Sequence, residues 1–343
     1  MYVAKESRYQ TMSYRRCGQS GLMLPEITLG LWQSFDQSST EKTARDILTA
    51  AFDLGVTHFD VANNYGVPPG SAETMLGRVL RTDLAPHRNE LVISTKAGWT
   101  KWPGPYGDHG SRKYLVTSCD ESLKRTGLDY FDIFYHHRPD RETPLIETMT
   151  ALDYLVRSGK TLYVGLSNYE HDEAIEAFGI LRALGTPCLI HQPVYSMFER
   201  EPEEGGVLDV CSQNGVGVIC YAPLAGGLLT DRYLNGVPSD SRASRNTMYL
   251  KTTQLTPEML TTLRGLNDIA AKRGQTLAQM SLSWVLRHDI VASALIGASR
   301  VSQLEDCVKA AGSPPFSEEE LRSIDAIIMM LDENQRKHPY PIR

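Results

Sequence analysis

The amino-acid sequence predicts an α/β protein whose parallel strands close into a (β/α)8 barrel, and two observations favour this fold class. Amphipathic segments end in glycine and are followed within a few residues by apolar, β-branched runs, as at Gly55, Gly127, Gly159, Gly185 and Gly215. Glycine suits the left-handed residue just past a helix, and such a run suits a strand buried on both faces. The second observation is that eight strands are predicted, separated by helical patterns through most of the chain.

The predicted strands follow one another at intervals that leave room for helices. They lie near residues 27–32, 57–61, 91–96, 131–136, 161–166, 188–192, 216–221 and 291–297. The helix before the second strand has one apolar stripe at i, i+3, i+4, i+7 and i+8, formed by Ala44, Ile47, Leu48, Ala51 and Phe52. The helix before the fourth strand behaves alike, with Leu115, Cys119 and Leu123. An open, doubly wound sheet is the structural competitor, but no GxGxxG motif follows any strand.

Three segments depart from this regular alternation. A long segment runs from Pro223 to about Leu255, and an extra helical pattern from Pro257 to Arg273 precedes the helix from Thr276 to His288. A second surplus helix, from about Ser317 to Leu331, closes the chain. Because closed barrels of this size fold as one unit, we expect residues 1–343 to form a single domain.

Composition and charge exclude several classes of function. Lys and Arg number 35 against 41 Asp and Glu, which gives a net charge of −6, and no cluster of basic residues suggests nucleic acid or an anionic membrane as a partner. The longest uncharged stretch, Cys211 to Thr230, is interrupted by glycine, proline and polar residues, so no membrane span is expected. The N-terminus lacks the apolar region of a secretory signal. Six scattered cysteines without metal-ligand spacing indicate a reduced protein of the cytoplasm with no metal site.

Polar side chains gather where the predicted strands end, which is where barrels of this class place their chemistry. Strands two to seven contribute, in order, Asp60 with Tyr65 just beyond it, Lys96, His136 with His137, Ser167 with Asn168, His191 with Gln192, and Tyr221. Because the strand ends of a barrel share one rim, we expect these side chains to surround one mouth.

Four of these residues suggest a proton-transfer site in which a phenol is the working acid. The reference pKa of tyrosine, near 10, is too high for easy proton sharing at neutral pH, but an adjacent ammonium lowers it. Lys96 would supply that charge beside Tyr65, and Asp60 would keep the buried ammonium protonated. A neutral His137 would hold a substrate carbonyl oxygen against the phenol.

Each residue also has a purely structural interpretation. Asp60 and Lys96 would form an ion pair at the rim, and Tyr65 would be a loop aromatic with a satisfied hydroxyl. The tandem histidines alternate faces, so one must point away from the barrel interior, and His58 and His191 are expected to be interior strand histidines. The convergence of four such residues from three consecutive strand ends favours the catalytic interpretation.

Several strings of the sequence resemble the aldo-keto reductase family. GVTHFDVANNYG is similar to the segment around the family's catalytic Asp and Tyr, ISTKAG to its Lys strand, and DYFDIFYHHRPD to the segment with its catalytic His. The resemblance runs from YRRCGQSGLMLPEITLGLW, similar to the family's barrel-bottom hairpin and first strand, to LIGASRVSQLEDC. VPPGSAE, WPGPYGDHGSRKYL, QPVYSMFER and YAPLAGGLLTDRYLNG resemble the bacterial L-glyceraldehyde 3-phosphate reductase group, which lies close to the β subunits of voltage-gated potassium channels.

The resemblance implies a TIM barrel with an N-terminal β-hairpin and two extra helices. It implies an oxidoreductase that uses NADPH to reduce small aldehydes, such as glyceraldehyde 3-phosphate or methylglyoxal, to alcohols, leaving NADP. The catalytic tetrad falls on Asp60, Tyr65, Lys96 and His137. Tyr65 would donate the proton while hydride arrives from the nicotinamide.

The resemblance also assigns a cofactor site along the rim. Ser167, Asn168 and Gln192 would hold the carboxamide, and Tyr221 would stack on the nicotinamide ring. The loop residues that would wrap the pyrophosphate are Leu224, Gly226 and Leu228, and those around the adenosine 2′-phosphate are Ser299, Arg300 and Gln303. Also assigned to the cofactor are Leu31, Trp32, Asp60, Pro223, Gly297, Asp306 and Cys307.

The cofactor assignments contain one departure from the family. Relatives usually carry Glu-Asn facing the adenine amino group, where this chain has Asp306 and Cys307. A shorter carboxylate and a poorly hydrogen-bonding thiol should weaken both cofactors alike. Arg300 should still make NADPH bind more tightly than NADH.

The expected substrate contacts are mostly aromatic. Trp32, Tyr65, Trp99 and His137, with the loop around Trp102 and Tyr106, would frame the substrate, although rim packing explains the last two equally well. Arg112 would clamp a substrate phosphate, because a guanidinium matches phosphate oxygens, or would instead brace its own helix.

Three other functions compete with reduction. A Schiff-base aldolase would use Lys96 as its nucleophile, which Asp60 would oppose. A cofactor-holding subunit that regulates a partner and turns over slowly would keep the same tetrad. A metal hydrolase is disfavoured, because no HExxH or HxH stands at a strand end. The resemblance also raises a homo-oligomer, for which the sequence shows no interface.

Overall fold

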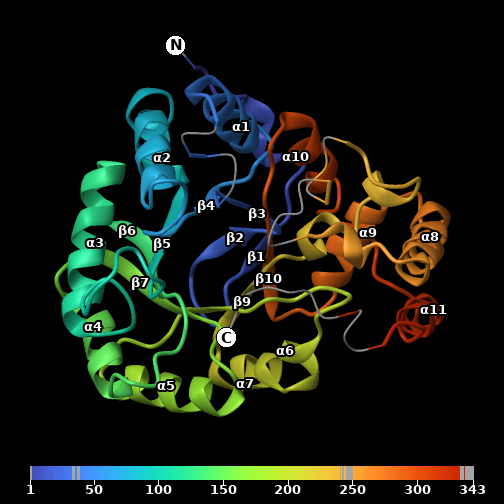
Figure 1. The fold of residues 1–343 in the computed structure, drawn as a ribbon. Helices are drawn as coiled ribbons and strands as arrows, with labels where there is room; N and C mark the ends of the chain where they lie inside the picture. The colour runs from blue at the N-terminus through green and yellow to red at the C-terminus, as the bar shows by residue number, and fades with distance from the viewer. Residues whose placement is uncertain are drawn as a thin grey trace.

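The computed structural model describes residues 2–32, 35–36, 39–239, 241, 243–244, 250–332 and 336. Eight parallel strands form a closed barrel in the order β10-β3-β4-β5-β6-β7-β8-β9 (Figure 1). They are β3 (Ile27–Gly30), β4 (His58–Asp60), β5 (Val92–Ala97), β6 (Phe131–His136), β7 (Thr161–Ser167), β8 (Ile190–Gln192), β9 (Gly217–Tyr221) and β10 (Val291–Ile296). The predicted fold class is confirmed, and each predicted strand corresponds to one of these.

The N-terminal hairpin, expected from the resemblance, lies outside the barrel sheet. Strands β1 (Tyr14–Arg16) and β2 (Met23–Pro25) pair antiparallel. Their turn packs against the segment that leads into β9, since the Gln19 amide donates to the Gly215 carbonyl at 2.9 Å. A Cβ at Gly18, where φ is +54°, would lie 2.2 Å from that same carbonyl oxygen. Only glycine fits this close approach. Because the turn contacts the residues just before β9, the hairpin lies at the end of the barrel where the strands begin, opposite their carboxyl ends.

Helices surround the barrel and connect its strands (Figure 1). They are α1 (Glu41–Asp53), α2 (Ser71–Thr82), α3 (Arg112–Thr126), α4 (Leu145–Arg157), α5 (His171–Ala183), α6 (Glu201–Glu204), α7 (Val207–Asn214), α9 (Leu277–Val285) and α10 (Val301–Val308). The predicted stripe of α1 is buried throughout. Thr40 and Ser111 cap α1 and α3 by accepting from the amides three residues ahead.

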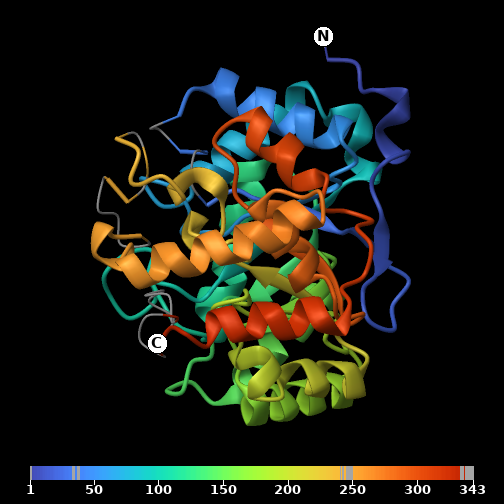
Figure 2. The same cartoon turned by 90° about the vertical axis from the view of Figure 1, so that its right-hand side faces the viewer.

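Both surplus helices are present. They are α8 (Pro257–Lys272) and α11 (Glu318–Ile328), which contact each other and cross the same side of the barrel (Figure 2). The predicted long segment after β9 contains the 3-10 turns η3 (Ala225–Gly227), η4 (Asp231–Tyr233) and η5 (Thr252–Gln254), and its residues 240, 242 and 245–249 lie outside the described residues. The remaining 3-10 turns are η1 (Glu6–Tyr9) and η2 (Ala85–Glu90).

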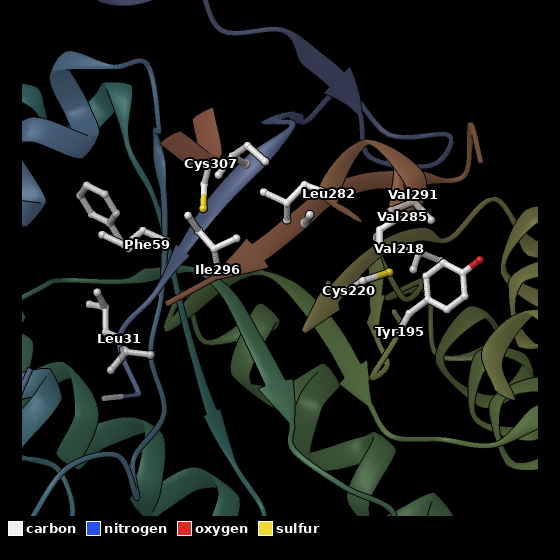
Figure 3. Close-up of a cluster of buried hydrophobic side chains, with 14 of the residues drawn as sticks. Leu31, Phe59, Tyr195, Val218, Cys220, Leu282, Val285, Val291, Ile296 and Cys307 are labelled. Atoms are coloured by element: carbon white, nitrogen blue, oxygen red, sulfur yellow. The ribbon is translucent and has the colours of Figure 1, made fainter. Parts of the chain in front are cut away.

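The apolar core lies between the barrel and its helices. Figure 3 shows part of it, including Leu31, Phe59, Leu282 and Ile296, all fully or almost fully buried. Burial on both faces of the strands explains their continuous apolar runs and leaves the strand ends as the place for polar chemistry. No helix in the described part of the chain is both long and apolar enough to cross a bilayer.

Candidate active site

The ends of β4, β5 and β6 bring the predicted tetrad together. Asp60 is the last residue of β4, Lys96 stands near the end of β5, and His137 follows β6 directly. The His137 amide donates to the Ala97 carbonyl at 2.9 Å, which continues the ladder and fixes the side chain at the rim. Asp60 and Lys96 are fully buried, and Tyr65, on the loop after β4, is partly exposed.

Lys96 is the centre of this arrangement. Its Nζ donates to Asp60 Oδ2, to the Val61 carbonyl at 3.1 Å and to the Tyr65 hydroxyl at 3.5 Å. Burial lowers the pKa of Lys96, and the Asp60 charge and hydrogen bond oppose this shift. All three ammonium hydrogens therefore have acceptors, and one of them is the phenol oxygen.

The two histidines at the end of β6, His136 in the strand and His137 just beyond it, point in different directions, as their alternation predicts. His137 lies edge-on to Tyr65 and Trp99, with ring centroids 5.8 and 6.3 Å apart, so it faces the mouth. Burial and the neighbouring Lys96 charge hold the pKa of His137 well below its ordinary value, which keeps the imidazole neutral. His136 instead bonds through Nδ1 to the Tyr169 hydroxyl at 2.7 Å, behind the rim, and burial lowers its pKa to about 4.

The other two strand histidines are buried, as expected, but they face different layers. His58 bonds to side chains of the barrel interior, Thr28 and Ser94. His191 lies edge-on to Phe178 of α5, with centroids 6.3 Å apart, so its ring lies between the barrel and the helical layer. Neither histidine points into the mouth beside Tyr65.

The opposite half of the rim carries the amides predicted to hold a carboxamide. Asn168 donates to the His137 carbonyl at 3.0 Å and accepts from the Tyr221 hydroxyl at 2.9 Å. Ser167 Oγ donates to the Gln192 carbonyl at 2.7 Å. The Gln192 side-chain nitrogen is buried and has no partner among the described residues. An oriented amide beside an unused donor fits a carboxamide ligand, because buried donors are normally satisfied.

The backbone of the loop after β9 has conformations and open space that would let a ligand approach it closely. Ala222, Ala225 and Gly226 have φ of 54°, 47° and 68°, and Gly227 has φ of 106° with open space where a Cβ would lie. Among the residues predicted to wrap a pyrophosphate, Leu224 and Gly226 are partly exposed and Leu228 is buried. Pro223 and Leu31 are buried too.

The segment after β10 presents its polar groups at the surface. Gly297 is exposed, and a Cβ added there would meet no atom within 4 Å, which leaves room for a ligand. Gln303 accepts from the amide and hydroxyl of Ser299 at 2.9 and 3.0 Å. Arg300 is exposed at the N-cap of α10. These positions fit an anionic group held by a guanidinium at a helix start.

Asp306 and Cys307 are already engaged by the protein. Asp306 accepts from Gln279 at 2.6 Å and from Thr276 at 3.2 Å, both at the start of α9. Cys307 is buried in the core shown in Figure 3, and burial raises the pKa of its thiol to about 12. Their role at an adenine ring stays a prediction.

Aromatic side chains frame the mouth on the side of Tyr65. The rings of Trp32 and Tyr65 lie 5.9 Å apart, and Trp32 is 38% exposed. The Arg138 guanidinium stacks on Trp99 at 4.0 Å, while Arg138 Nε donates to the Gly98 carbonyl at 2.9 Å. Trp99 is therefore held in place from both its backbone and its ring.

The remaining predicted substrate residues lie further along the same loop and at the start of α3. Trp102 packs edge-on against Tyr114 of α3, and the Lys113 ammonium lies over Tyr106, which is 52% exposed. Arg112 is exposed at the start of α3 and lines a hollow on the outer surface with Lys113, Val116, Thr117 and Tyr154. None of the tetrad lines that hollow, so the phosphate clamp stays a prediction.

Sequence reasoning missed several residues that support the site. Arg138 bonds to Asp108 at 2.9 Å and so ties the Trp99 loop to the end of β6. Ser94 donates to Asp60 at 2.6 Å. Ser94 stands two residues before Lys96, on the same face of the strand, so period-two alternation could have indicated it. The described residues hold no cluster of His, Cys, Asp and Glu that could bind a metal ion.

Comparisons with known proteins show which family and which structures this chain is similar to. The model of the Aldo/keto reductase family matches residues 26–329. The chain is similar to the L-glyceraldehyde 3-phosphate reductase of Escherichia coli (strain K12), with 53% identity over 330 residues and 95% of each chain covered. It is 37% identical over 308 residues to a probable voltage-gated potassium channel subunit beta of Arabidopsis thaliana, covering 89% of this chain and 93% of that protein. A crystal structure of the thermostable aldo-keto reductase Tm1743 with the inhibitor epalrestat is similar, with a TM-score of 0.73, 29% identity, and coverage of 92% of this chain and 100% of that one.

Proposed function

This chain belongs to the aldo/keto reductase family of oxidoreductases, and on that premise we propose that it reduces small aldehydes to alcohols with NADPH. Glyceraldehyde 3-phosphate and methylglyoxal are the first candidate substrates. The observation that carries the proposal is the placement of the Tyr65 hydroxyl, 3.5 Å from the Lys96 ammonium and beside a neutral His137. A proton donor, the charge that increases its acidity and a neutral hydrogen-bonding ring thus share one mouth.

Each member of the tetrad has a separate task in this reaction. NADPH, when bound, supplies the hydride that the carbonyl carbon takes up. Tyr65 donates its phenolic proton to the carbonyl oxygen, so that hydride and proton together convert the aldehyde to an alcohol. The Lys96 ammonium favours the phenolate that remains, and Asp60 balances the Lys96 charge. The neutral His137 orients the carbonyl oxygen toward the phenol.

Residues of the other strand ends would hold the cofactor. The unused Gln192 donor and the fixed Asn168 amide fit a carboxamide, and the hydroxyl bond of Tyr221 to Asn168 holds its ring for stacking. The exposed Arg300 at the start of α10 supports the choice of NADPH over NADH. Members of this family use NAD(P)H in general, so the preference for NADPH is the finer part of the proposal.

Of the competing functions, the aldolase meets an obstacle at Lys96. A Schiff-base aldolase needs a free amine, whereas all three hydrogens of this group are directed at acceptors, including Asp60. A cofactor-holding regulatory subunit stays the alternative, supported by the similarity to a probable potassium channel subunit beta. The higher identity to a reductase favours turnover.

Three broader proposals accompany the activity. We propose that residues 1–343 form a single domain, because strands from both ends of the chain, β3 and β10, pair in one barrel. The six cysteines are unpaired and buried, which supports a protein of the reducing cytoplasm. We propose no nucleic-acid or membrane partner, in keeping with the net charge of −6, and leave a homo-oligomer as an expectation for solution measurements.

The decisive experiment follows NADPH oxidation with methylglyoxal, glyceraldehyde 3-phosphate and an aromatic aldehyde. Steady turnover with at least one of them supports the reductase, and the ratio of kcat/KM values ranks the substrates. Tight cofactor binding with no turnover on any aldehyde would favour the regulatory subunit. Covalent trapping of Lys96 by borohydride in the presence of substrate would instead indicate the aldolase.

A further inference from the structure

A continuous row of hydrogen-bonded side chains crosses the barrel interior behind Asp60. Ser94 Oγ donates to Asp60 Oδ1 at 2.6 Å, and His58 Nε2 lies 2.9 Å from Ser94 Oγ. Thr28 Oγ1 lies 3.2 Å from His58 Nδ1 and 2.7 Å from Ser293 Oγ. All five side chains are fully buried. The row spans β10, β3, β4 and β5, which are neighbours in the barrel (Figure 1).

Donor and acceptor chemistry fixes the direction of every bond in this row. An ionised Asp60 only accepts, so the single hydroxyl hydrogen of Ser94 is used toward it. Ser94 must then accept from His58, which places the imidazole hydrogen on Nε2. The His58 Nδ1 is left as an acceptor, so Thr28 donates to it and accepts in turn from Ser293. Each donor points toward Asp60, and such aligned bonds strengthen one another.

Burial keeps the His58 imidazole in one protonation state, which supports these bond directions. Desolvation lowers the pKa of His58 to about 4, with a smaller opposing effect from Asp60 and a further lowering by Lys96. The imidazole therefore stays neutral across the range in which a cytoplasmic enzyme works, and a neutral ring has only one donor. That donor is the Nε2 hydrogen directed at Ser94.

We propose that His58 and Ser94 are positioning residues of the reductase, which hold Asp60 ionised and oriented so that Lys96 keeps its proton beside Tyr65. The inference rests on the proposed role of Tyr65 as the proton donor. Without the hydrogen bond from Ser94, the proton of the Lys96 ammonium would shift toward the Asp60 carboxylate. The charge next to Tyr65 would fall, and the phenol would become a weaker acid.

Other ionisable groups around Lys96 are balanced or neutral, so they do not replace this control. Tyr135 on β6 lies under the ammonium, 5.7 Å from its ring centroid, and burial raises the pKa of Tyr135 well above the ordinary value. His137 is neutral because burial lowers its pKa. Glu73 on α2 is paired with Arg125 on α3 at 2.6 Å. The bond from Ser94 thus controls the charge that faces the phenol.

Two substitutions of one histidine separate positioning from simple packing. In His58→Gln the amide nitrogen reaches the place of Nε2 and still donates to Ser94, whereas in His58→Asn it reaches only the place of Nδ1. We expect His58→Gln to retain most of the kcat and His58→Asn to lose about two- to tenfold, as for loss of one hydrogen bond between neutral groups. The KM and the NADPH affinity should stay unchanged in both.

A serine pair supplies the matched control. Ser94→Ala removes the bond to the Asp60 carboxylate itself, so it should lower kcat by about ten- to a hundredfold. It should also move the basic limb of the kcat profile to higher pH, because Tyr65 becomes a weaker acid. Ser281→Ala removes an equally buried hydroxyl, one that donates to the Leu277 carbonyl at 2.7 Å in α9, away from the row. It should leave kcat and its pH profile as in the wild type. Equal profiles for Ser94→Ala and Ser281→Ala would overturn the proposal.

A measurement on the wild-type protein tests the inference without any variant or turnover. The ¹⁵N chemical shifts of His58 should show a protonated Nε2 and an unprotonated Nδ1 from neutral pH upward. The opposite tautomer would leave Ser94 without a donor for its second bond and would overturn the assignment. If Tyr65→Phe keeps full activity, the proposed function fails instead, whatever tautomer His58 adopts.

Discussion

The Tyr65 hydroxyl is the atom on which the proposed chemistry depends, and its neighbours allow a clean test. Its ring packs against Trp32 and His137, and its oxygen contacts Lys96. Tyr65→Phe therefore removes the proton donor and keeps the shape of the mouth. We expect reduction to fall by about 10²- to 10⁴-fold, the usual contribution of general acid catalysis.

Cofactor binding provides the control for this variant. NADPH titrated into Tyr65→Phe by fluorescence quenching should bind as in the wild type, because the amides of the opposite rim are untouched. A loss of activity below about tenfold would remove Tyr65 from the role of general acid.

Arg300 is the residue that should distinguish the two nicotinamide cofactors. Its exposed guanidinium at the start of α10 would pair with a 2′-phosphate, a bond that contributes about 1.5–3 kcal/mol. Arg300→Ala should weaken NADPH binding about ten- to a hundredfold and leave NADH nearly unchanged. Arg322→Ala on α11, where the arginine pairs with Glu318 one turn away, is the matched control and should change neither affinity. An equal loss of NADH affinity would contradict the assignment of Arg300 to the 2′-phosphate.

The residues that the sequence alone could predict share one property, which is a position at the end of a predicted strand. Asp60, Lys96 and His137 stand at or beside the ends of apolar runs, and the family motifs around them are specific in order and spacing. Ser94 is indicated only by its alternation with Lys96, and nothing in the sequence indicates Ser293, because its bond to Thr28 joins strands far apart in the chain. The burial of Cys307 was likewise invisible, since it depends on how α10 packs.

At the scale of elements, hydrophobic pattern and the glycines at helix ends predict the strands well, but they predict the loops less well. The predicted strand near 188–192 is three residues long in the structure, Ile190–Gln192, in which Ile190 and His191 pair with both neighbouring strands and Gln192 pairs with β7. The segment after β9 was predicted only as an irregularity, because left-handed backbone at Ala222 and Ala225 follows from its tertiary setting. A hydrophobic pattern in the sequence indicates which residues are buried, whereas the conformation of a loop depends on its contacts with the rest of the fold.

The loop between β5 and α3 yields a prediction at this scale. Arg138 ties that loop to β6 through the Gly98 carbonyl and Asp108, and it stacks on Trp99. Arg138→Met removes the forked hydrogen bonds and releases the indole, so we expect the KM for aldehydes to rise severalfold with a smaller change in kcat. Arg138→Lys should resemble Arg138→Met, because an ammonium cannot bond both acceptors in the same fork.

Substrate panels and thermal melts decide whether the loop acts on the substrate or on the fold. Steady-state kinetics should show the same rise in KM for each aldehyde at an unchanged NADPH affinity. A loss confined to the melting temperature, with wild-type KM values, would mean that Arg138 serves only the stability of the loop.

At the scale of the whole molecule, the closed barrel joins its first and last strands, and the fold buries three histidines that take up a proton less readily than in the unfolded chain. β3 pairs with β10, so residues near both ends of the chain depend on the same interior. His58, His136 and His191 are fully buried, and desolvation lowers the pKa of each to about 4. Protonation of any of them therefore favours unfolding.

The resulting pH dependence has a definite sign. An unfolded histidine titrates near 6.5, so between about pH 6.5 and pH 4 the unfolded chain binds more protons than the native one, and stability falls as the pH is lowered. The shifts correspond to a loss on the order of 2 kcal/mol for each histidine between pH 7.5 and pH 5. Carboxylates whose pKa is lowered, such as Glu90 and Asp140, both at about 2, lose their contribution only below about pH 4. The window from pH 7.5 to pH 5 thus isolates the histidines.

Urea unfolding across that window measures the effect. We expect the free energy of unfolding to fall steeply from pH 7.5 to pH 5, and His191→Leu to make the slope shallower by the contribution of one histidine. His191 suits this test because its ring packs beside Phe178 and it stands outside the proposed tetrad and the row behind Asp60. If His191→Leu has the wild-type slope, desolvation of His191 does not contribute to acid sensitivity, because removing a titrating group must remove its share of the proton uptake.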